Sequence, residues 1–400
     1  MSNFHLGDFF SNRQEPGQAG LPVMSVTMND SLVLRDDLDR RTESALRPDQ
    51  HLLVRKGDIA YNMMRMWQGA CGLAKADGIV SPAYVVLTPK AGIDARFAYH
   101  WFKSSRMIYL LWAYSHGLTE DRLRLYFDSF AEIPASPPAL EKQKRIAAII
   151  DTWDQAIDQI ERLATAKRRR KKALLQKLFN DLPKRPYLEA ADVWFSGIDK
   201  KSRAEETPIL LCNYMDVFHN TRITADLEFM PATASKKQIA ENRLRRHDVI
   251  FTKDSETSED IAEPALVDDD IPNLVCGYHL AIARPRAGVA YGPFLAQAMR
   301  HQAIRWQFSR LANGVVRFGL TLDAIEQAEI FLPSMSVQEK IASVLDAEDM
   351  MIEWLTKRAA TLNTQKRGLM QKLLTGEWRL DKRFDQQGLE PQSALMGEAP

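Results

Sequence analysis

The residues closest to a metal-binding pattern are Cys276 and His279, which form a C-x-x-H pair. Cysteine and histidine are typical zinc ligands, but a structural zinc site uses about four of them. No second ligand pair lies near this one, and an internal repeat aligns Ser81 and Tyr84 with it. We therefore expect no metal site.

Two other stretches approach the patterns of enzymes that act on nucleic acid. Ser81-Pro82-Ala83-Tyr84 approaches the Asn/Asp/Ser-Pro-Pro-aromatic loop that receives a flipped base in amino-methyltransferases, but alanine replaces the second proline. No glycine-rich cofactor loop precedes it. The acidic run 254–270 could hold Mg²⁺ but lacks a convincing Glu-x-Lys element. We interpret the first stretch as part of a strand and the second as a solvated loop.

Motifs for other reactions are missing from the sequence. It contains no G-x-x-x-x-G-K-[ST], no G-x-S-x-G and no H-E-x-x-H. These absences argue against a P-loop ATPase, an α/β-hydrolase and a zinc protease. We predict no catalytic residue in this chain.

The chain is organised by a segment that occurs twice. Residues 143–178 align without a gap with residues 338–373, at an offset of 195, and 12 of the 36 pairs are identical. Neither glycine nor proline interrupts the first copy. Apolar residues recur in both copies with the 4,3 spacing of a heptad seam. The seam comprises Ile146, Ile150, Trp153, Ile157 and Ile160 in the first copy, and Ile341, Leu345, Ile352, Leu355 and Leu362 in the second.

Such a seam needs a partner, and the nearest candidate is the other copy. We therefore predict two long helices that pack on each other. At 1.5 Å per residue, each would be a rod of roughly 57 Å. The alternative is two ordinary core helices of a helical domain.

Composition indicates a soluble multidomain protein. The chain has 400 residues and a net charge of +1, which excludes a uniformly basic surface but allows local basic patches such as KRRRKK at 167–172. Its three cysteines, Cys71, Cys212 and Cys276, fit a reducing compartment. The first residues contain no apolar signal core, and no run of 18 apolar residues occurs. We expect a cytoplasmic protein without a membrane span.

The parts before the two helices also repeat. Residues 55–62 align with 245–252, and residues 79–88 align with 274–283. The predicted strands and helices make each block a mixed α/β domain, with the stretch 97–113 helical. The predicted divisions are a first block at 1–138, a first helix at 139–180, a second block at 181–333, a second helix at 334–378 and a tail at 379–400.

Short motifs recur in order in both blocks. A Gly-Asp-hydrophobic strand occurs at 57–60, and His247 replaces the glycine in its counterpart at 247–250. Each block ends with an Ile-Pro or related element, at 133–138 and 330–333, before a helix start that contains Gln143 or Gln338. With these motifs, residues 5–378 resemble the specificity subunit of type I restriction–modification systems. His247 for glycine and Phe331 for proline are departures, but the other copy keeps the pattern each time.

The resemblance implies an α/β (mixed α+β) fold with two target-recognition domains, separated by two long antiparallel helices that form a coiled coil with a pseudo-twofold repeat. Each domain would read one half of a bipartite sequence in double-stranded DNA. The helices would set the spacing and dock two methyltransferase subunits, and restriction subunits could join. No catalytic site or cofactor is expected in this chain, while S-adenosylmethionine, ATP and Mg²⁺ are expected on partner subunits. Half-sites one turn apart need readers ~34 Å apart, which such a rod can provide.

Candidate DNA contacts lie in two loops of each block. Arginine, glutamine and asparagine suit base edges, and a tryptophan could stack, although packing in the core is an equal alternative for Trp67. For any single residue, a surface role without contact is also open. The candidates are Asn62, Arg65, Trp67, Gln68, Thr119, Arg122 and Arg124 in the first block, and Lys253, Ser255, Thr257, Ser258 and Arg317 in the second.

Two other classes of function compete with this interpretation. A fused nuclease or methyltransferase would need a cofactor loop or a carboxylate cluster, and none is found. A protein-binding scaffold would use the two blocks to bind proteins, and it would lack salt-dependent binding to random duplex DNA.

Overall fold

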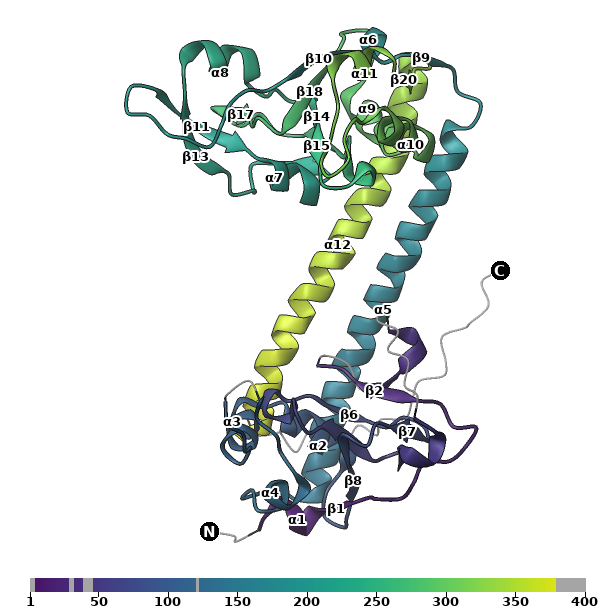
Figure 1. Cartoon of the computed structure of the whole chain (residues 1–400), viewed down its shortest axis with the longest axis vertical. Coiled ribbons are helices and arrows are strands. Elements are labelled where there is room, and N and C mark those ends of the chain that lie inside the picture. Colours follow the sequence, from purple (N-terminus) through teal and green to yellow (C-terminus); the bar gives the residue numbers. More distant parts are fainter. Residues whose placement is uncertain (1–3, 29–31, 39–45, 120–121, 379–400) are drawn as a thin grey trace, which may run out of the picture. The chain divides into compact units, whose positions relative to one another are not determined.

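A computed structural model describes residues 4–28, 32–38, 46–119 and 122–378. The chain is a mixed α/β protein that divides into two compact units (Figure 1). The first unit contains residues 1–159 and 358–400, and the second contains residues 160–357. Each unit thus joins one block to parts of both long helices. The predicted tail at 379–400 lies outside the described residues.

The first unit is built on an antiparallel sheet with the strand order β1-β8-β5-β6. These strands are β1 (Phe10–Asn12), β5 (Ile59–Asn62), β6 (Cys71–Leu73) and β8 (Tyr84–Pro89). Two antiparallel pairs lie outside this sheet: β2 (Met24–Val26) with β3 (Leu32–Leu34), and β4 (Leu52–Val54) with β7 (Gly78–Val80).

Short helices and an aromatic core complete this block. The helices are α1 (Leu6–Phe9), α2 (Ala95–Phe102), α3 (Ser105–Ala113) and α4 (Phe127–Ala131), with 3₁₀ turns η1 (Arg35–Asp37), η2 (Pro48–Gln50) and η3 (Met66–Gln68). The rings of Phe10, Phe102 and Phe130 lie 5.5–6.0 Å apart and are fully buried. Aromatic pairs at this separation stabilise a core beyond the area that they bury.

The second unit has a larger set of strands. Its main sheet has the order β10-β18-β14-β16-β12, and a second sheet has the order β13-β11-β17. The first comprises β10 (Ala191–Phe195), β12 (Arg222–Ile223), β14 (Val249–Thr252), β16 (Pro264–Val267) and β18 (Leu280–Pro285). The second comprises β11 (Thr207–Cys212), β13 (Met230–Ala234) and β17 (Leu274–Cys276). Two small pairs are β9 (Lys184–Pro186) with β20 (Glu329–Phe331), and β15 (Asp254–Ser255) with β19 (Phe318–Gly319).

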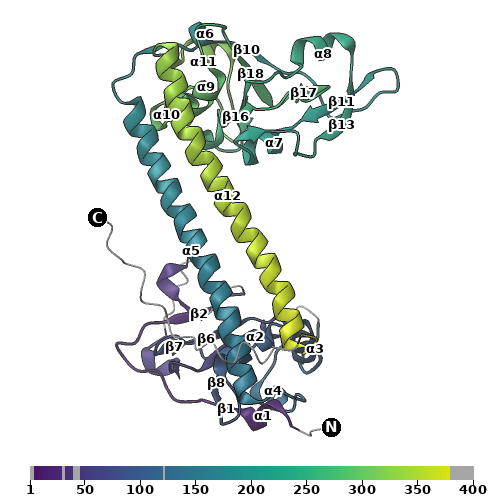
Figure 2. The same ribbon diagram turned by 180° about the vertical axis from the view of Figure 1, so that it is seen from behind.

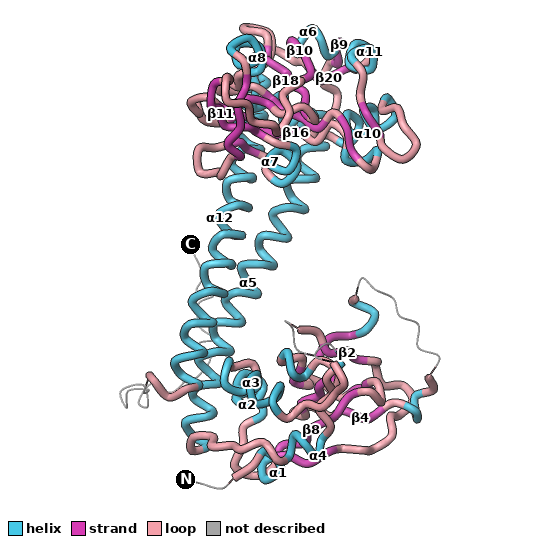
Figure 3. The backbone as a smooth tube through the Cα atoms, turned by 60° about the vertical axis from the view of Figure 1, so that its left-hand side comes forward, coloured by secondary structure: helices cyan, strands magenta, loops and turns pink. Residues whose placement is uncertain are grey.

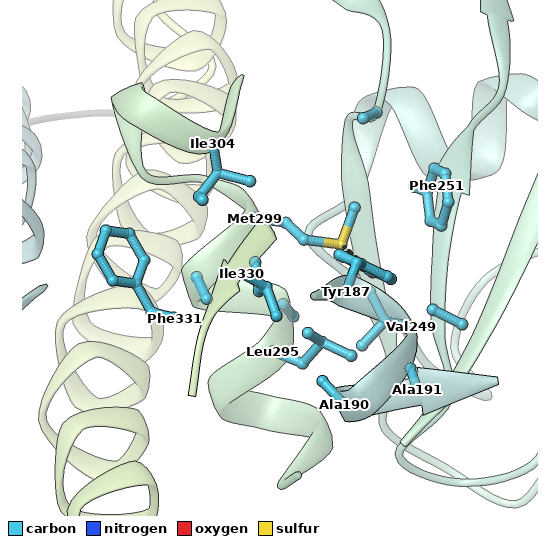
Figure 4. Close-up of a cluster of buried hydrophobic side chains, with 14 of the residues drawn as sticks. Tyr187, Ala190, Ala191, Val249, Phe251, Leu295, Met299, Ile304, Ile330 and Phe331 are labelled. Carbon is cyan, nitrogen blue, oxygen red and sulfur yellow. Dashed lines mark hydrogen bonds between the residues drawn. The ribbon is translucent and has the colours of Figure 1, made fainter. Parts of the chain in front are cut away.

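The helices of this unit are α6 (Tyr187–Ala190), α7 (Tyr214–His219), α8 (Lys236–Asn242), α9 (Gly292–Met299), α10 (Gln302–Leu311) and α11 (Leu322–Glu326), with the 3₁₀ turn η5 (Ser258–Asp260). α7 and α9 pack on strands of the main sheet, and α8 packs on β17 of the second sheet (Figure 2). In the core, Tyr187 points at Met299, with its Oη 3.0 Å from the sulfur (Figure 4). Val249 and Phe251 of β14 belong to the same buried cluster, which therefore joins the sheet to the helical layer.

The predicted block repeat is visible in the pairing of strands. β5 pairs with β8 in the first unit, and β14 pairs with β18 in the second, both antiparallel. Ile59 faces Leu87, and Val249, which aligns with Ile59, faces Ala283. Ala283 lies one residue beyond the position that aligns with Leu87 in the repeat. The two blocks therefore share a central pair of strands although their sequences have diverged.

Three local predictions were wrong. The stretch 79–88 is not one strand, because Ser81–Ala83 forms a turn between β7 and β8 in which Tyr84 N donates to Ser81 O at 3.0 Å. The helical stretch 97–113 is interrupted at Ser104, whose hydroxyl accepts from Met107 N and caps α3. The acidic run 254–270 is not a solvated loop, because it contains the buried strand β16.

The two long helices are α5 (Leu140–Phe179) and α12 (Met335–Leu374), each 40 residues long (Figures 1 and 3). Inside both units they run antiparallel. In the first unit Lys366 of α12 pairs with Asp154 of α5, and in the second Lys171 of α5 pairs with Asp349 of α12.

The predicted seam has two kinds of surroundings. Ile146 and Ile150 belong to the core of the first block, and Ile341 and Leu345 to the core of the second. Ile157 and Leu355, farther along the helices, are also buried. Trp153, Ile160, Ile352 and Leu362 are half-buried. The start of each helix therefore packs in the core of its own block, which also contains residues from the end of the other helix, Leu373 in the first core and Leu175 and Phe179 in the second.

Charged residues also join the helices. Lys167 and Arg170 lie 3.6 and 3.4 Å from the carboxylate of Glu348, and Arg168 donates to Thr356 Oγ1 at 2.9 Å. Part of the KRRRKK run is thus engaged with α12.

A buried glutamine connects each block to its helix in the same way. Gln143 is fully buried, and its Oε1 accepts from Asp94 N at 2.8 Å while its Nε2 donates to Gly92 O and Pro138 O. Gln338, its counterpart in the repeat, is also fully buried. Its Oε1 accepts from Tyr291 N at 2.9 Å, and its Nε2 donates to Val289 O and Pro333 O. These three bonds satisfy the buried amide of each glutamine and tie the start of each helix to its own block.

None of the helices in the described ranges combines the length and the hydropathy needed to span a bilayer.

Candidate nucleic-acid interface

A turn with the sequence Gly-Asp or His-Asp precedes the central strand of each block. Gly57 has a positive φ of 94°, and His247 adopts a φ of 72° at the matching position. Asp58 is buried and accepts from Arg55 N at 2.8 Å and from Arg13 Nε at 2.8 Å. The aspartate of this motif is therefore structural, because it holds the turn that precedes β5.

The second block repeats this arrangement. Asp248 accepts from Arg245 N at 2.9 Å, and Arg284 donates to both of its oxygens at 2.8 and 2.7 Å. His247 therefore keeps the backbone of the glycine that it replaces, and the departure from the family motif leaves the turn intact.

The loop after β5 is a compact turn. Asn62 Oδ1 accepts from Met64 N at 3.0 Å, and Trp67 Nε1 donates to Met64 O at 3.0 Å. Gly69 closes the turn with a φ of 85°. Met66 is fully buried and anchors the loop in the core, whereas Trp67 is half-buried. These hydrogen bonds and the buried Met66 side chain therefore hold the loop in one conformation.

Arg65 and Gln68 are placed together on this turn. Arg65 is exposed, and its Nη1 donates to Gln68 Oε1 at 3.2 Å. The bond restricts the guanidinium before any ligand binds. A restricted arginine beside an amide is suited to bidentate contact with base edges.

The second candidate loop of the first block lies beside the first. His116 and Arg124 form a two-bond bridge, with N–O distances of 2.9 Å, that closes the loop between them. Leu125 N then donates to Met63 O at 2.9 Å. Thr119, Arg122 and Arg124 are exposed. The structure thus brings all seven candidates of the first block onto two adjoining loops.

The loops of the second block are joined by the same bond. Leu320 N donates to Lys253 O at 2.7 Å, at the positions that match Leu125 and Met63 in the repeat. The pairing of β15 with β19 extends the contact. Arg317 and Thr257 are exposed, and Thr257 donates to Asp260 at 2.8 Å.

Three second-block candidates are more buried than Thr257 and Arg317. Ser255 is only 7 % exposed, and its hydroxyl lies 3.1 Å from Tyr214 Oη. It supports the loop from inside and does not present a group to a ligand. Lys253 has its Nζ 5.3 Å from the centre of the Phe195 ring. Ser258 is half-buried at the start of η5.

Charge differs between the two pairs of loops. The first block presents Arg65, Arg122 and Arg124, whereas the second combines Arg317 with the exposed carboxylates of Glu256 and Glu259. Asp254 Oδ1 lies 2.6 Å from Nδ1 of His279. A carboxylate can accept from the amino group of cytosine, so the two blocks are suited to different bases.

Sequence reasoning missed an aromatic helix face beside these loops. α3 packs on the turn at 66–68 and exposes Tyr109 and Trp112, whose ring centres lie 6.0 Å apart. α10 packs on η5 and exposes Trp306, with the Arg310 guanidinium 4.5 Å from its ring. Tyr109 and Trp306 align at the offset of 197, and this alignment of exposed aromatics was the available signal.

One group of side chains has the composition of a metal site. His100, Asp151 and Asp154 bring a nitrogen and two carboxylates within 4.8 Å of one another. Asp154 is paired with Lys366, and Asp151 lies 3.1 Å from Arg96. Two cations already compensate the carboxylates, so this group fits an ion-pair network better than a metal centre.

The cysteines are not poised for ligation either. Burial raises the pKa of the Cys71 thiol to about 12, and it also raises the pKa of Cys212 and Cys276. Metal ligation and nucleophilic attack need the thiolate. Cys276 is fully buried, and Nδ1 of His279 lies 2.6 Å from Oδ1 of Asp254.

Comparison with known proteins shows what this chain is similar to. Residues 20–168 match the model of the type I restriction modification DNA specificity domain. The S subunit of a type I restriction–modification system from M. genitalium is similar in structure, with a TM-score of 0.57 and 14 % identity, covering 92 % of this chain and 94 % of that one. A chain from a structure concerning complex assembly and conformational transition of a type I system has a TM-score of 0.52 and 15 % identity, covering 94 % and 97 %. No curated protein sequence matches the chain.

Residues 20–168 are thus similar to a DNA specificity domain, and the fold of the whole chain is similar to that of type I S subunits. The match of residues 20–168 supports DNA sequence recognition by this part of the chain. The scaffold and fused-enzyme alternatives are not favoured.

Proposed function

We propose that each block reads one half of a bipartite sequence in double-stranded DNA, and that the paired helices set the distance between the halves. The observation that carries the proposal is the shared backbone bond, Leu125 to Met63 and Leu320 to Lys253, which unites the candidate loops in both blocks. The backbone bond that joins the two candidate loops is the same in both blocks, whereas the side chains of these loops differ. The loops are therefore suited to read different bases. The chain would have no catalytic site of its own.

Block exchange tests this division of labour. Residues 1–138 are replaced by the corresponding block of another such subunit, and methylated adenines are mapped in host DNA. One half of the methylated sequence should change, while the other half and the spacer stay the same. If both halves change together, the blocks do not read independently.

The partners are proposed to be two methyltransferase subunits docked on α5 and α12, with restriction subunits able to join. S-adenosylmethionine, ATP and Mg²⁺ would then be bound by those partners, in the cytoplasm. An apolar stripe on the first half of α12 supports docking. Met350 and Trp354 are 66 % and 60 % exposed, and Val344 and Met351 are also exposed. Exposed apolar side chains grouped on one helix are characteristic of protein interfaces.

Substitution of the stripe tests docking separately from DNA reading. Met350→Ser with Trp354→Ser should weaken co-purification of the methyltransferase subunits while the melting temperature of the isolated chain stays the same. Tyr109→Ser, at an equally exposed aromatic of α3 and outside the two long helices, is the matched control. Full retention of both methyltransferase subunits by the double variant would contradict docking at this stripe.

A further inference from the structure

The most exposed large apolar side chains of the described residues lie at one place in the repeat. Leu118 is 102 % exposed, Val315 is 92 % and Val316 is 86 %, whereas the next in rank, Met350, is 66 %. Leu118 and Val315 align at the offset of 197. Single exposed apolar residues are ordinary, but the same extreme exposure in two diverged blocks requires a common cause.

Both tips follow a glycine that closes the loop tightly. A Cβ at Gly117 would lie 2.6 Å from Arg122 O, and a Cβ at Gly314 would lie 1.9 Å from Arg317 O. Side-chain carbons do not approach backbone oxygens this closely, so each glycine allows the returning backbone to pass. The loops are narrow, and the apolar side chain stands at the turn.

The base of each tip is fixed to the rest of its block. His116 and Arg124 exchange backbone bonds of 2.9 Å, and so do their counterparts Asn313 and Gly319. The next residue then joins the neighbouring candidate loop, as described above for Leu125 and Leu320. Because these backbone bonds fix the loop, its apolar side chain is positioned before binding, and little conformational entropy is lost on binding.

Cations flank both apolar tips. Arg122 and Arg124 are exposed on the returning side of the first loop, and Arg317 is exposed next to Val316 in the second. Phosphate groups border every base-pair step of a duplex, so an apolar tip between guanidinium groups matches a base-pair step between its phosphates.

We propose that Leu118 and the Val315–Val316 pair are wedges that insert between adjacent base pairs, one in each half-site. This inference rests on the proposed reading of half-sites and adds residues that read the deformability of DNA. Insertion removes the apolar surface of the tip from water and unstacks one step, which kinks the duplex. Pyrimidine–purine steps unstack most easily, so each half-site should prefer such a step under its wedge.

The test uses the full chain in complex with its partner subunits and a duplex with the methylated sequence. 2-Aminopurine, whose fluorescence rises on unstacking, is placed at successive positions of each half-site. The wild type should brighten one position in each half. Leu118→Ala should remove the signal in one half only, and Val315→Ala with Val316→Ala should remove it in the other. Cognate affinity should fall about tenfold for Leu118→Ala, because most of a leucine side chain is lost from the contact.

Matched variants separate the wedge from other roles. Leu118→Gln keeps the size but not the apolar character and should also lose the signal, while Leu118→Met should keep it. Met230→Ala, at an exposed apolar residue of β13, should change nothing. Because Leu118 is fully exposed, its variants should melt at the wild-type temperature.

The outcomes distinguish this inference from the function on which it rests. Wild-type protein without sequence-specific binding would overturn both. Specific binding and methylation that Leu118→Ala leaves unchanged, with the same 2-aminopurine signal, would overturn the wedge alone. Loss of partner subunits from the Leu118→Ala complex would show that the tip contacts protein, and would also overturn the wedge.

Discussion

Lys171 donates to both carboxylate oxygens of Asp349, at 2.6 and 2.7 Å. Their counterparts in the repeat, Lys366 and Asp154, form the same pair with the roles of the two helices exchanged. When two similar helices pack antiparallel, each contact occurs twice, because the two copies exchange roles. The reciprocal ion pair is the expected signature of that symmetry.

The first prediction concerns this ion pair. Lys171→Met should lower the free energy of unfolding by about 2–3 kcal/mol, between the values for exposed and for fully buried pairs. The reason is that Asp349 loses its ion pair and is left with the hydrogen bond from Gln297 and the charge of Arg300. Urea unfolding measures the change. Lys366→Met is the matched control and should cost less, because Asp154 is more exposed than Asp349. A larger loss for Lys366→Met would contradict this ranking.

The second prediction concerns the buried glutamines. Gln143→Leu leaves Asp94 N, Gly92 O and Pro138 O without their bonds. Stability should fall by about 2–4 kcal/mol, because buried groups without partners are costly. Gln338→Leu should have a similar effect on the second unit. Calorimetry should show the loss, and a melting transition unchanged in both variants would mean that water replaces the glutamine.

The third prediction concerns Arg65. If it reads a base, Arg65→Ala should cost about 1–3 kcal/mol on the cognate duplex and much less on a scrambled one. Gln68→Ala should show part of this loss, because Gln68 holds the guanidinium. Salt titrations with both duplexes measure the effect. Equal losses on both, with a salt slope lower by about one, would place Arg65 on phosphate.

The fourth prediction concerns Gly314. Its φ is 148°, and an added Cβ would meet Arg317 O. Gly314→Ala should open the loop at 313–319 and weaken recognition of one half-site, with the global fold retained. Gly288→Ala is the control, since it also changes a glycine of positive φ but meets nothing within 4 Å. Methylation mapping should show relaxed specificity in one half for the first variant only.

The fifth prediction concerns acid stability. Burial by itself raises the pKa of Asp151, but the hydrogen bond from His100 and the charge of Arg96 outweigh it and hold that pKa below its ordinary value. The folded state thus keeps the charge to a lower pH than the unfolded state does. This stabilisation is complete above the ordinary pKa of an aspartate, about 3.9, and is lost as pH falls through the lowered folded-state pKa. Unfolding of Asp151→Asn should therefore depend less on pH in this acid range than unfolding of the wild type.

Local patterns in the sequence determined the long helices and the repeat. Heptad spacing in both copies, and the absence of glycine and proline from the first, predicted helices at 139–180 and 334–378, and the structure has them at 140–179 and 335–374. The alignment of 55–62 with 245–252 identified the central strands. Such features depend on neighbours within a few residues, and a single sequence contains those neighbours.

Tertiary structure alone decided which distant groups meet. Gln143 forms hydrogen bonds with the backbone of residues 92 and 94, and Met63 O accepts from Leu125 N. The hydroxyl of Ser255 forms a hydrogen bond with Tyr214 Oη. The seam at Ile146 and Ile341 packs on the blocks because each helix starts inside a core. Nor could the sequence show that Leu118 stands in solvent, since an apolar residue is more often buried. These outcomes depend on how separate elements pack, and packing is a property of the whole chain and not of any local pattern.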